Sequence, residues 1–310
     1  MKKSDYIFGK KNLDDYELFY QPHDYVATQY YQFWKNNGRN TSFFPFIQET
    51  EKHFLSHYIL TKEFFKHLQP FQFLKSNDHA VQVGFHDQYL DLGVSQPLII
   101  SSIVGNNGNV IAFDPDPINI EKIKSYCFQN NISNIKIKKI GVMNKKGKEK
   151  FVFFSDFSSS NTAIDVFENC KEMISDRWKS RITEKSRTVT VDVDSLNNLL
   201  TEKIDFLNIT ANGAEAEVLE GATKLLKNEN ICIAFPLVNM SKNGLDMLQN
   251  SGFKITIADA PHRPWESEQF FYACAVKKTI ESLSNMGFRK VTMSEEINPS
   301  SPFTIYKIKN

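Results

Sequence analysis

Hydrophobic residues along the chain form short apolar runs that alternate with stretches of helical spacing. The clearest case lies within residues 80–119. There an apolar run ends at Gly84, a helical stretch follows from Leu90 to Val104, and a second apolar run covers Val110 to Phe113. A Gly-Asn turn separates the helical stretch from the second run. This order predicts strand, helix, strand, which is one βαβ unit of a parallel sheet.

The residues at the ends of these two predicted strands are candidates for ligand binding. Gly84 ends the first strand, and Asp114 directly follows the second. Ligands of open parallel sheets bind outside the carboxyl ends of the strands, so we expect Gly84 and Asp114 to lie side by side at such a site. The carboxylate would then hold the hydroxyls of a ribose. The alternative is that the Asp-Pro-Asp-Pro sequence of residues 114–117 only caps the next helix.

The alternation of strands and helices continues to about Lys278. The pattern predicts helices over residues 119–131 and 195–200, strands over residues 135–140, 150–154, 187–193, 254–258 and 270–276, and a buried strand that ends near Thr210 before a helix that begins near Ala214. The polar loop of residues 158–161 either faces a ligand or is a solvated connection. We therefore predict that residues 79–278 form one α/β domain, with a mainly parallel sheet of about seven strands and helices on both faces.

Residues 1–78 are rich in Tyr and Phe and show no strand pattern with a turn between. Their best helical stretch runs from Gln48 to Leu68, where Phe54, Tyr58 and Phe65 recur at helical spacing. Because aromatic rings bury large areas, we predict a helical N-terminal segment that covers one face of the α/β domain. The alternatives are a part of the substrate pocket and a homodimer surface.

Residues 279–310 repeat a local pattern from the end of the α/β domain. The stretch from Leu283 to Arg289 echoes the stretch from Leu248 to Lys254, and each is followed by two strand-like runs. We predict a helix followed by a hairpin, which would be a C-terminal α+β extension. The repeat is either a decayed duplication or the common way in which a helix ends at a glycine before a strand.

Composition excludes several classes of function. The 310 residues carry 37 basic and 36 acidic side chains, so no global field favours nucleic acid or a membrane surface. No run approaches the roughly 18 apolar residues of a membrane span, and the first residues lack an apolar core, so we expect a cytoplasmic protein. The four cysteines are far apart, and the pair His53 and His57 has no evident third ligand, so neither a disulfide framework nor a metal site is predicted.

Three motifs in a fixed order give the chain a resemblance to a known family. They are Val-x-Val-Gly ending at Gly84, Ala-Phe-Asp-Pro-x-Pro-x-Asn at residues 112–119, and Asn-Gly-Ala-Glu-x-x-Val-Leu-x-Gly-Ala at residues 212–222. Together with the Ser-rich loop between the second and the third, they resemble the FkbM-type methyltransferases over about residues 80–278. The third motif, a helix entry, is the most specific of the set.

The resemblance implies a Rossmann-like sheet with an antiparallel last strand, S-adenosylmethionine as the cofactor, and methyl transfer to an oxygen of a sugar or another small-molecule acceptor. It also places cofactor-binding residues at the strand ends. By position these are Gly84 for the amino-acid part, Asp114 for the ribose, where the family usually has Glu, Gly141 and Val142 near the adenine, and Thr210 and Asn212 where the family usually has acids. The candidate catalytic base is His86 or Asp87, and the alternative is a helix cap with an exposed histidine beside it.

The chain also departs from the family pattern. The first strand lacks the usual acid and later glycines, and Phe85, His86 and Gln88 are expected to narrow the approach that glycines would leave open. Asn208, Thr210 and Asn212 stand in place of Lys, Asp and Glu, and thus lose charge-assisted attraction to an ammonium group. Two hypotheses follow. The chain is a working methyltransferase with an altered site, or a catalytically inactive relative that binds a ligand or a partner protein.

Overall fold

The computed structural model describes residues 16–20, 73–87, 90, 95–154, 161–165, 186–236, 240–258, 272–277, 289–291 and 304–308. In this part of the chain the helices are α4 (Gln96–Val104), α5 (Pro117–Gln129), α8 (Leu196–Leu199), α9 (Glu215–Glu220) and α10 (Lys242–Asn250), and η7 (Leu225–Lys227) is a 3-10 turn. The strands are β1 (Tyr16–Tyr20), β2 (His79–Val83), β3 (Asn109–Asp114), β4 (Ile135–Lys139), β5 (Gly141–Val142), β6 (Gly147–Phe154), β7 (Thr162–Ala163), β8 (Ser186–Asp194), β9 (Phe206–Ile209), β10 (Cys232–Pro236), β11 (Lys254–Ala258), β12 (Tyr272–Val276), β13 (Arg289–Val291) and β14 (Thr304–Ile308).

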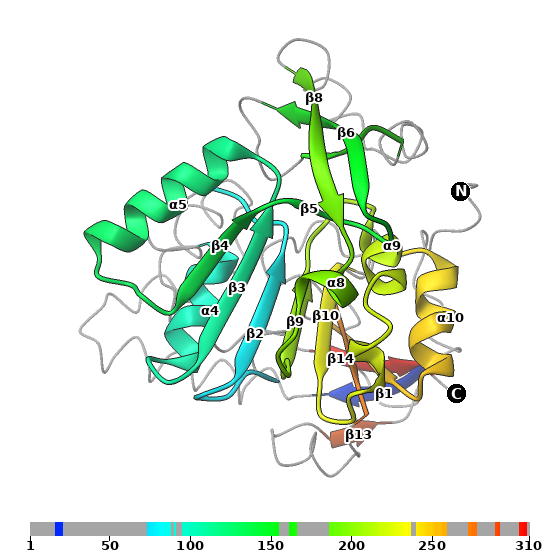
Figure 1. The fold of residues 1–310 in the computed structure, drawn as a ribbon. Coiled ribbons are helices and arrows are strands. Elements are labelled where there is room, and N and C mark those ends of the chain that lie inside the picture. The colour runs from blue at the N-terminus through cyan, green and yellow to red at the C-terminus, as the bar shows by residue number, and fades with distance from the viewer. Residues whose placement is uncertain are drawn as a thin grey trace, which may run out of the picture.

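The large sheet confirms the predicted topology in part: its central strands are parallel and β12 is antiparallel, but the predicted strands of residues 150–154 and 187–193 lie outside it, in a second sheet, because they pair with each other. Its strand order is β13-β1-β14-β11-β12-β10-β9-β2-β3-β4 (Figure 1). Strands β4, β3, β2, β9 and β10 lie side by side in this order and are parallel to one another. Strand β12 is antiparallel to both β10 and β11. Val81 on β2 lies directly opposite Ile111 on β3, so the two apolar runs of the βαβ unit are adjacent parallel strands.

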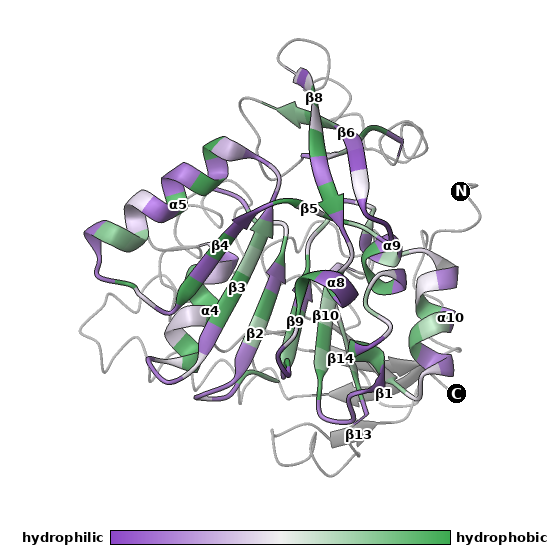
Figure 2. Ribbon diagram, in the orientation of Figure 1, coloured by the Kyte–Doolittle hydropathy of each residue, from purple (hydrophilic) through white to green (hydrophobic). Residues whose placement is uncertain are grey.

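The core lies on both faces of this sheet because alternate residues of each strand point to opposite sides. Val81 belongs to a buried cluster that includes α9 and α10 residues, whereas its neighbour Ala80 packs in a second cluster with Ile99 and Ile100 of α4. Strands covered on both faces are apolar along their whole length. Figure 2 shows hydrophobic stretches in the central strands, interrupted by hydrophilic positions, and Leu207 of β9 has no exposed surface.

Helix α4 begins later, and helix α5 begins earlier, than the sequence pattern predicted. Helix α4 begins at Gln96, after the N-cap Ser95, and not at Leu90, since Pro97 in the first turn favours a helix start there. Helix α5 begins at Pro117, and its N-cap Asp116 accepts a hydrogen bond from the Ile118 amide at 2.9 Å. The reading of the Asp-Pro-Asp-Pro sequence as a helix cap therefore holds for Asp116.

The two chain ends extend the sheet in a way that the sequence analysis did not predict. Strand β1 lies between β13 and β14 and is antiparallel to both. The N-terminal segment, predicted to be helical, is thus a strand at Tyr16–Tyr20, and the predicted C-terminal hairpin is wrong because β1 separates its two strands. Tyr and Phe favour strands as much as they suit buried helices, and strand pairing does not require closeness in sequence. The predicted helix of residues 48–68, with His53 and His57, lies outside the described residues.

A second, four-stranded sheet has the order β5-β8-β6-β7. Its long antiparallel pair, β6 and β8, lies beyond the carboxyl ends of β2 and β3 (Figure 1). A small core of Met143, Phe151, Phe153 and Val193 packs against Ala214 at the start of α9. The second sheet therefore stands next to the edge of the large sheet where ligands of such folds bind.

The structure also bears on the cysteines, on membrane-spanning helices and on metal sites. Cys127, Cys232 and Cys274 are buried, and none of the three is in a disulfide bond. Within the described ranges, no helix is long and apolar enough to cross a membrane, and no group of three or more His, Cys, Asp or Glu side chains is placed to hold a metal ion.

The position of β1 gives a first testable prediction. Deleting residues 1–20 removes the strand that pairs with β13 and β14, whereas deleting residues 1–15 retains it. We expect the longer deletion to lower the melting temperature by about 2–4 °C or more relative to the shorter one, since a loss of about 1 kcal/mol shifts large domains by this amount. Calorimetry on the two truncated proteins measures the difference, and equal melting temperatures would contradict the placement of β1.

Candidate functional site

Gly84 and Asp114 meet at the carboxyl edge of the large sheet, as the sequence predicted. The Gly84 amide donates to the Phe113 carbonyl at 2.8 Å, next to Asp114. Gly84 has a φ of 70°, and a Cβ atom there would lie 2.3 Å from the Thr210 carbonyl oxygen. Only glycine fits this conformation and this close approach of β2 to β9.

The Asp114 carboxylate is buried and holds the backbone around it. Its side chain is 4% exposed. Oδ2 accepts a hydrogen bond from the Phe85 amide at 3.0 Å, and Oδ1 accepts one from the Asp116 amide at 2.8 Å. The Asn119 side-chain amide lies 3.5 Å from Oδ1, at the limit of a hydrogen bond. Burial is the main cause that raises the pKa of Asp114, the nearby charge of Asp116 adds to it, and these hydrogen bonds lower it, so that the pKa lies at about 7.

The geometry of Asp114 tests whether a ribose fits. A carboxylate offers about four acceptor positions, and two or three of them are in use here. An Asp side chain is one methylene shorter than Glu, so its oxygens stay against the backbone amides of Phe85 and Asp116. Asp114 therefore fits a ribose by type and by place, but it can hold both hydroxyls only after the hydrogen bond from Phe85 has been exchanged.

A neutral hydrogen-bond network lies between β2 and β9. The Asn208 amide donates to Gln82 Oε1 at 2.7 Å, and Gln82 Nε2 in turn donates to the Gly84 carbonyl at 2.5 Å and to Thr210 Oγ1 at 3.0 Å. Thr210 Oγ1 also donates to the Gly84 carbonyl at 2.7 Å. Thr210, a predicted cofactor residue, thus lies beside Gly84 and uses its hydroxyl within the protein.

Asn212 belongs to a second network, which joins the two sheets. Its side-chain amide donates to the Asn161 carbonyl at 2.9 Å, and Thr162 Oγ1 donates to the Asn212 carbonyl at 2.9 Å. The Asn161 amide donates to Asp116 Oδ2 at 2.8 Å, and Arg187 pairs with Asp116 Oδ1 at 3.4 Å. From the sequence, Asp116 was expected only as a helix cap and Asn161 only as part of a polar loop. No local pattern reveals that residues so far apart in the chain are in contact.

The other predicted cofactor residues, Gly141 and Val142, form strand β5 of the second sheet. Both are buried, and the Val142 side chain belongs to the main core cluster. The preceding residue, Ile140, donates its amide hydrogen to the Asp114 carbonyl at 3.2 Å. The structure therefore brings the start of β5 next to Asp114, although the Val142 side chain packs inward.

The candidate bases His86 and Asp87 lie in the loop after β2, next to Phe85, and they have different surroundings. The ring of Phe85 is 4% exposed and packs in the cluster of Ala112 and Ile120, so it does not fill the cofactor approach as the sequence analysis expected. His86 is half-buried, and its carbonyl accepts a hydrogen bond from Ser95 Oγ at 2.9 Å. Asp87 forms an ion pair with Lys122 of α5 and is not the cap of α4. Gln88 lies outside the described residues.

Glu215 explains the most specific sequence motif. This carboxylate has no exposed surface, and it accepts hydrogen bonds from the amides of Ala211 at 2.9 Å and Gly213 at 2.7 Å. The motif at residues 212–222 thus builds the turn that leads from β9 into α9. Its role in the structure is to place the end of β9, beside which Thr210 and Asn212 stand.

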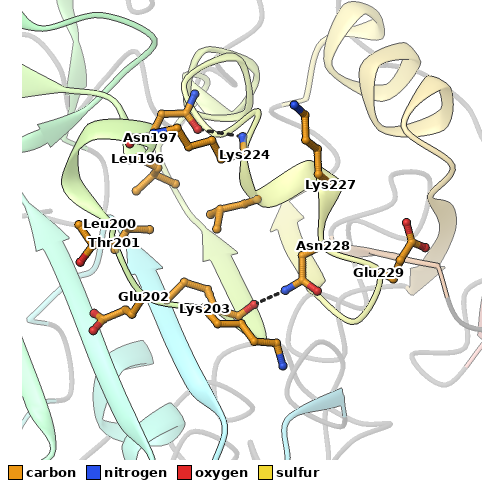
Figure 3. Close-up of a pocket in the computed structure, with 12 residues that line it drawn as sticks. Leu196, Asn197, Leu200, Thr201, Glu202, Lys203, Lys224, Lys227, Asn228 and Glu229 are labelled. Carbon is orange, nitrogen blue, oxygen red and sulfur yellow. Dashed lines mark hydrogen bonds between the residues drawn. The ribbon is translucent and has the colours of Figure 1, made fainter.

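A pocket of about 520 Å³ lies at the other end of the sheet (Figure 3). It is lined by α8, the loop after α8 and the η7 turn, with Leu200 and Ile204 among its apolar residues. The Asn228 amide donates to the Ile204 carbonyl at 2.7 Å across it. Its residues 201–204 and 227–229 precede β9 and β10, so this part of the pocket adjoins the amino ends of these two strands, and neither Gly84 nor Asp114 lines it.

Comparison with known proteins gives a family match. A family model described as the methyltransferase FkbM domain matches residues 82–271. No curated protein sequence matches the chain.

Several solved structures are similar at low identity. Methyltransferase FkbM from Methylobacillus flagellatus KT is 13% identical with a TM-score of 0.43, over 69% of this chain and 50% of that protein. Aeropyrum pernix fibrillarin, in complex with natively bound S-adenosyl-L-methionine, is 13% identical with a TM-score of 0.37, over 69% of this chain and 73% of that one. A SAM-dependent O-methyltransferase from Thermotoga maritima is 12% identical with a TM-score of 0.35, over 66% and 61% of the two chains. The chain thus spans half the length of the FkbM protein that it matches.

The buried Asp114 predicts a pH dependence of stability. Its folded pKa of about 7 lies above the ordinary value of 3.8, so the folded protein keeps a proton that the unfolded chain releases. This contribution to stability is complete below pH about 4 and is lost as the pH rises through about 7, with a slope of at most about 1.4 kcal/mol per pH unit. Urea unfolding of the wild type and of Asp114→Asn between pH 4.5 and 8 measures it. We expect the unfolding free energy of the wild type to fall relative to that of Asp114→Asn as the pH rises, and a difference between the two proteins that does not change with pH would contradict the assignment.

Proposed function

Because the chain belongs to the methyltransferase FkbM domain family, whose members use S-adenosylmethionine, we propose that it transfers a methyl group to an oxygen of a sugar or another small-molecule acceptor. The match covers more than half of the chain and includes the whole carboxyl edge of β2, β3 and β9. Methyl transfer in general follows from the family. We propose in addition that the methyl group goes to an oxygen atom and that the acceptor is a sugar or another small molecule.

The observation that carries the proposal is the contact of Gly84 with the end of β3 at Asp114. Gly84 lets the end of β2 approach the Thr210 carbonyl at the end of β9, and Asp114 supplies a carboxyl group at the next strand end. We propose that Gly84, Thr210 and Asn212 contact the amino-acid part of the cofactor, that Asp114 holds its ribose, and that Gly141 and Val142 lie near its adenine. The cofactor supplies a methyl group on a positively charged sulfur.

The protein must then place the acceptor hydroxyl in line with this methyl group and accept the hydroxyl proton. His86 and Asp87 stand in the loop directly after Gly84. Asp87 is held by its ion pair with Lys122, whereas imidazole titrates near neutral pH in general. We therefore propose His86 as the base and Asp87 as the residue that fixes the loop against α5.

A second candidate function is that of a catalytically inactive relative that binds a ligand or a partner protein. The neutral network of Gln82, Asn208 and Thr210 favours it, since this network leaves no charge to attract an ammonium group. The two candidates differ in whether the carboxyl edge binds the cofactor.

Calorimetric titration with S-adenosylmethionine and with S-adenosylhomocysteine tests the proposal. At pH 8, above the Asp114 pKa of about 7, we expect binding of both, and we expect Asp114→Ala to weaken it about tenfold to a hundredfold, since hydrogen bonds to an ionised acid contribute roughly 1.5–3 kcal/mol each. Asp87→Ala is the matched control at a neighbouring acid, and it should leave the affinity nearly unchanged. Equal affinities for the wild type and Asp114→Ala would remove Asp114 from the site.

Restoring acids at the end of β9 tests the other part of the site. In the double variant Thr210→Asp with Asn212→Glu, the ammonium group of the cofactor gains charged partners, so we expect tighter binding, by about tenfold. The same titration measures this. If neither the wild type nor the double variant binds either compound, the methyltransferase proposal gives way to the inactive relative.

A further inference from the structure

Asn161 spans the edge of the large sheet directly at the end of β2. Its side-chain amide donates to Asp116, which follows β3, and its carbonyl accepts from Asn212, which follows β9. Strand β2 lies between β9 and β3 in the sheet. Neighbouring strands are about 4.8 Å apart, so these contacts cross about 10 Å and pass over the strand that ends at Gly84.

The remaining hydrogen bonds of this segment hold Asn161 in place. Its side-chain oxygen accepts from the Phe154 amide at 2.9 Å, and the next residue, Thr162, donates to the Asn212 carbonyl at 2.9 Å. Asp116 is 3% exposed, and it also binds the Ile118 amide and Arg187. We call Asn161 and its bonds to Asp116 and Asn212 the Asn161 bridge.

The bridge engages Asn212, which is one of the residues proposed to contact the cofactor, and Asp116, whose amide is bonded to the proposed ribose residue Asp114. Asp116 Oδ2 accepts from the Asn161 side chain at 2.8 Å, and the Asn212 side-chain amide donates to the Asn161 carbonyl at 2.9 Å. A ligand that lies against Gly84 and reaches from the end of β3 to the end of β9 passes over the end of β2, as the bridge does. The bridge and such a ligand therefore compete for the same protein groups.

We propose that the Asn161 bridge closes the cofactor site of the free protein, so that a nucleoside-type ligand binds only when Asn161 exchanges its bonds to Asp116 and Asn212. This inference rests on the proposed function, because it assumes that the ligand occupies the edge at Gly84. It adds that Asn161, in the polar loop, sets the affinity of the site. The energy of breaking the bridge is subtracted from the binding energy of the ligand.

The test is calorimetric titration of the full chain with S-adenosylhomocysteine. Asn161→Ala removes the side-chain bond to Asp116, and we expect it to bind about threefold to tenfold more tightly than the wild type, as expected when a neutral hydrogen bond no longer has to be broken. Thr162→Val keeps the shape of its side chain and removes only the bond to the Asn212 carbonyl, so it should bind about twofold to fivefold more tightly. Asn228→Ala, which removes a comparable bond to Ile204 at the opposite edge, is the matched control and should bind as the wild type does.

The outcomes separate the bridge from the proposed function. Tighter binding by Asn161→Ala or Thr162→Val, including binding that appears only in these variants, supports the bridge. Binding by the wild type that is equal or weaker in both variants overturns the bridge and leaves the proposed function intact. Absence of binding in all four proteins overturns both. Thermal unfolding of each variant shows that it is folded, and Thr162→Val keeps the test valid if Asn161→Ala does not fold.

Discussion

The buried carboxylate of Asp114 determines how the chain leaves the central strands. By accepting the amides of Phe85 and Asp116, it fixes the first residue of the loop after β2 and the residue that caps α5. A carboxylate buried without such donors would be strongly destabilising, and these hydrogen bonds offset part of its desolvation. This one side chain thus connects the start of the β2 loop with the start of α5, and Asp116, which it holds, is also a partner of Asn161.

The same edge shows how a charged site can be replaced by a neutral one. Gln82 and Asn208 are cross-strand partners in β2 and β9, and their amides bind each other within the sheet. Two amides avoid the large desolvation cost of a buried ion pair, so the strands remain closely packed without charge. The network is not complete among the described residues, because Asn208 Oδ1 is buried there without a hydrogen-bond partner, which costs about 1–3 kcal/mol.

The second sheet and the chain termini are placed by pairing between distant segments. Arg187 of β8 and Asn161 before β7 both reach Asp116, which ties the small sheet to the end of β3. At the far edge of the large sheet, β14 pairs with β11, and β1 then pairs with β14. The edge strand of a sheet has backbone amide and carbonyl groups without partners. Each further strand forms hydrogen bonds with these groups of the strand next to it. The sheet thus grows outward from the α/β domain with segments from both ends of the chain.

The sequence by itself determined the α/β domain and the place of its ligand edge. Continuous apolar runs separated by helical stretches fix parallel strands, and the motifs placed Gly84, Asp114 and Thr210 at strand ends that do meet. It did not determine the partners of these side chains. The saturation of Asp114, the bridge through Asn161 and the insertion of β1 between β13 and β14 were decided by tertiary structure. The physical reason is that periodicity records which residues are buried, whereas a hydrogen bond between residues far apart in sequence depends on where packing brings two backbones together.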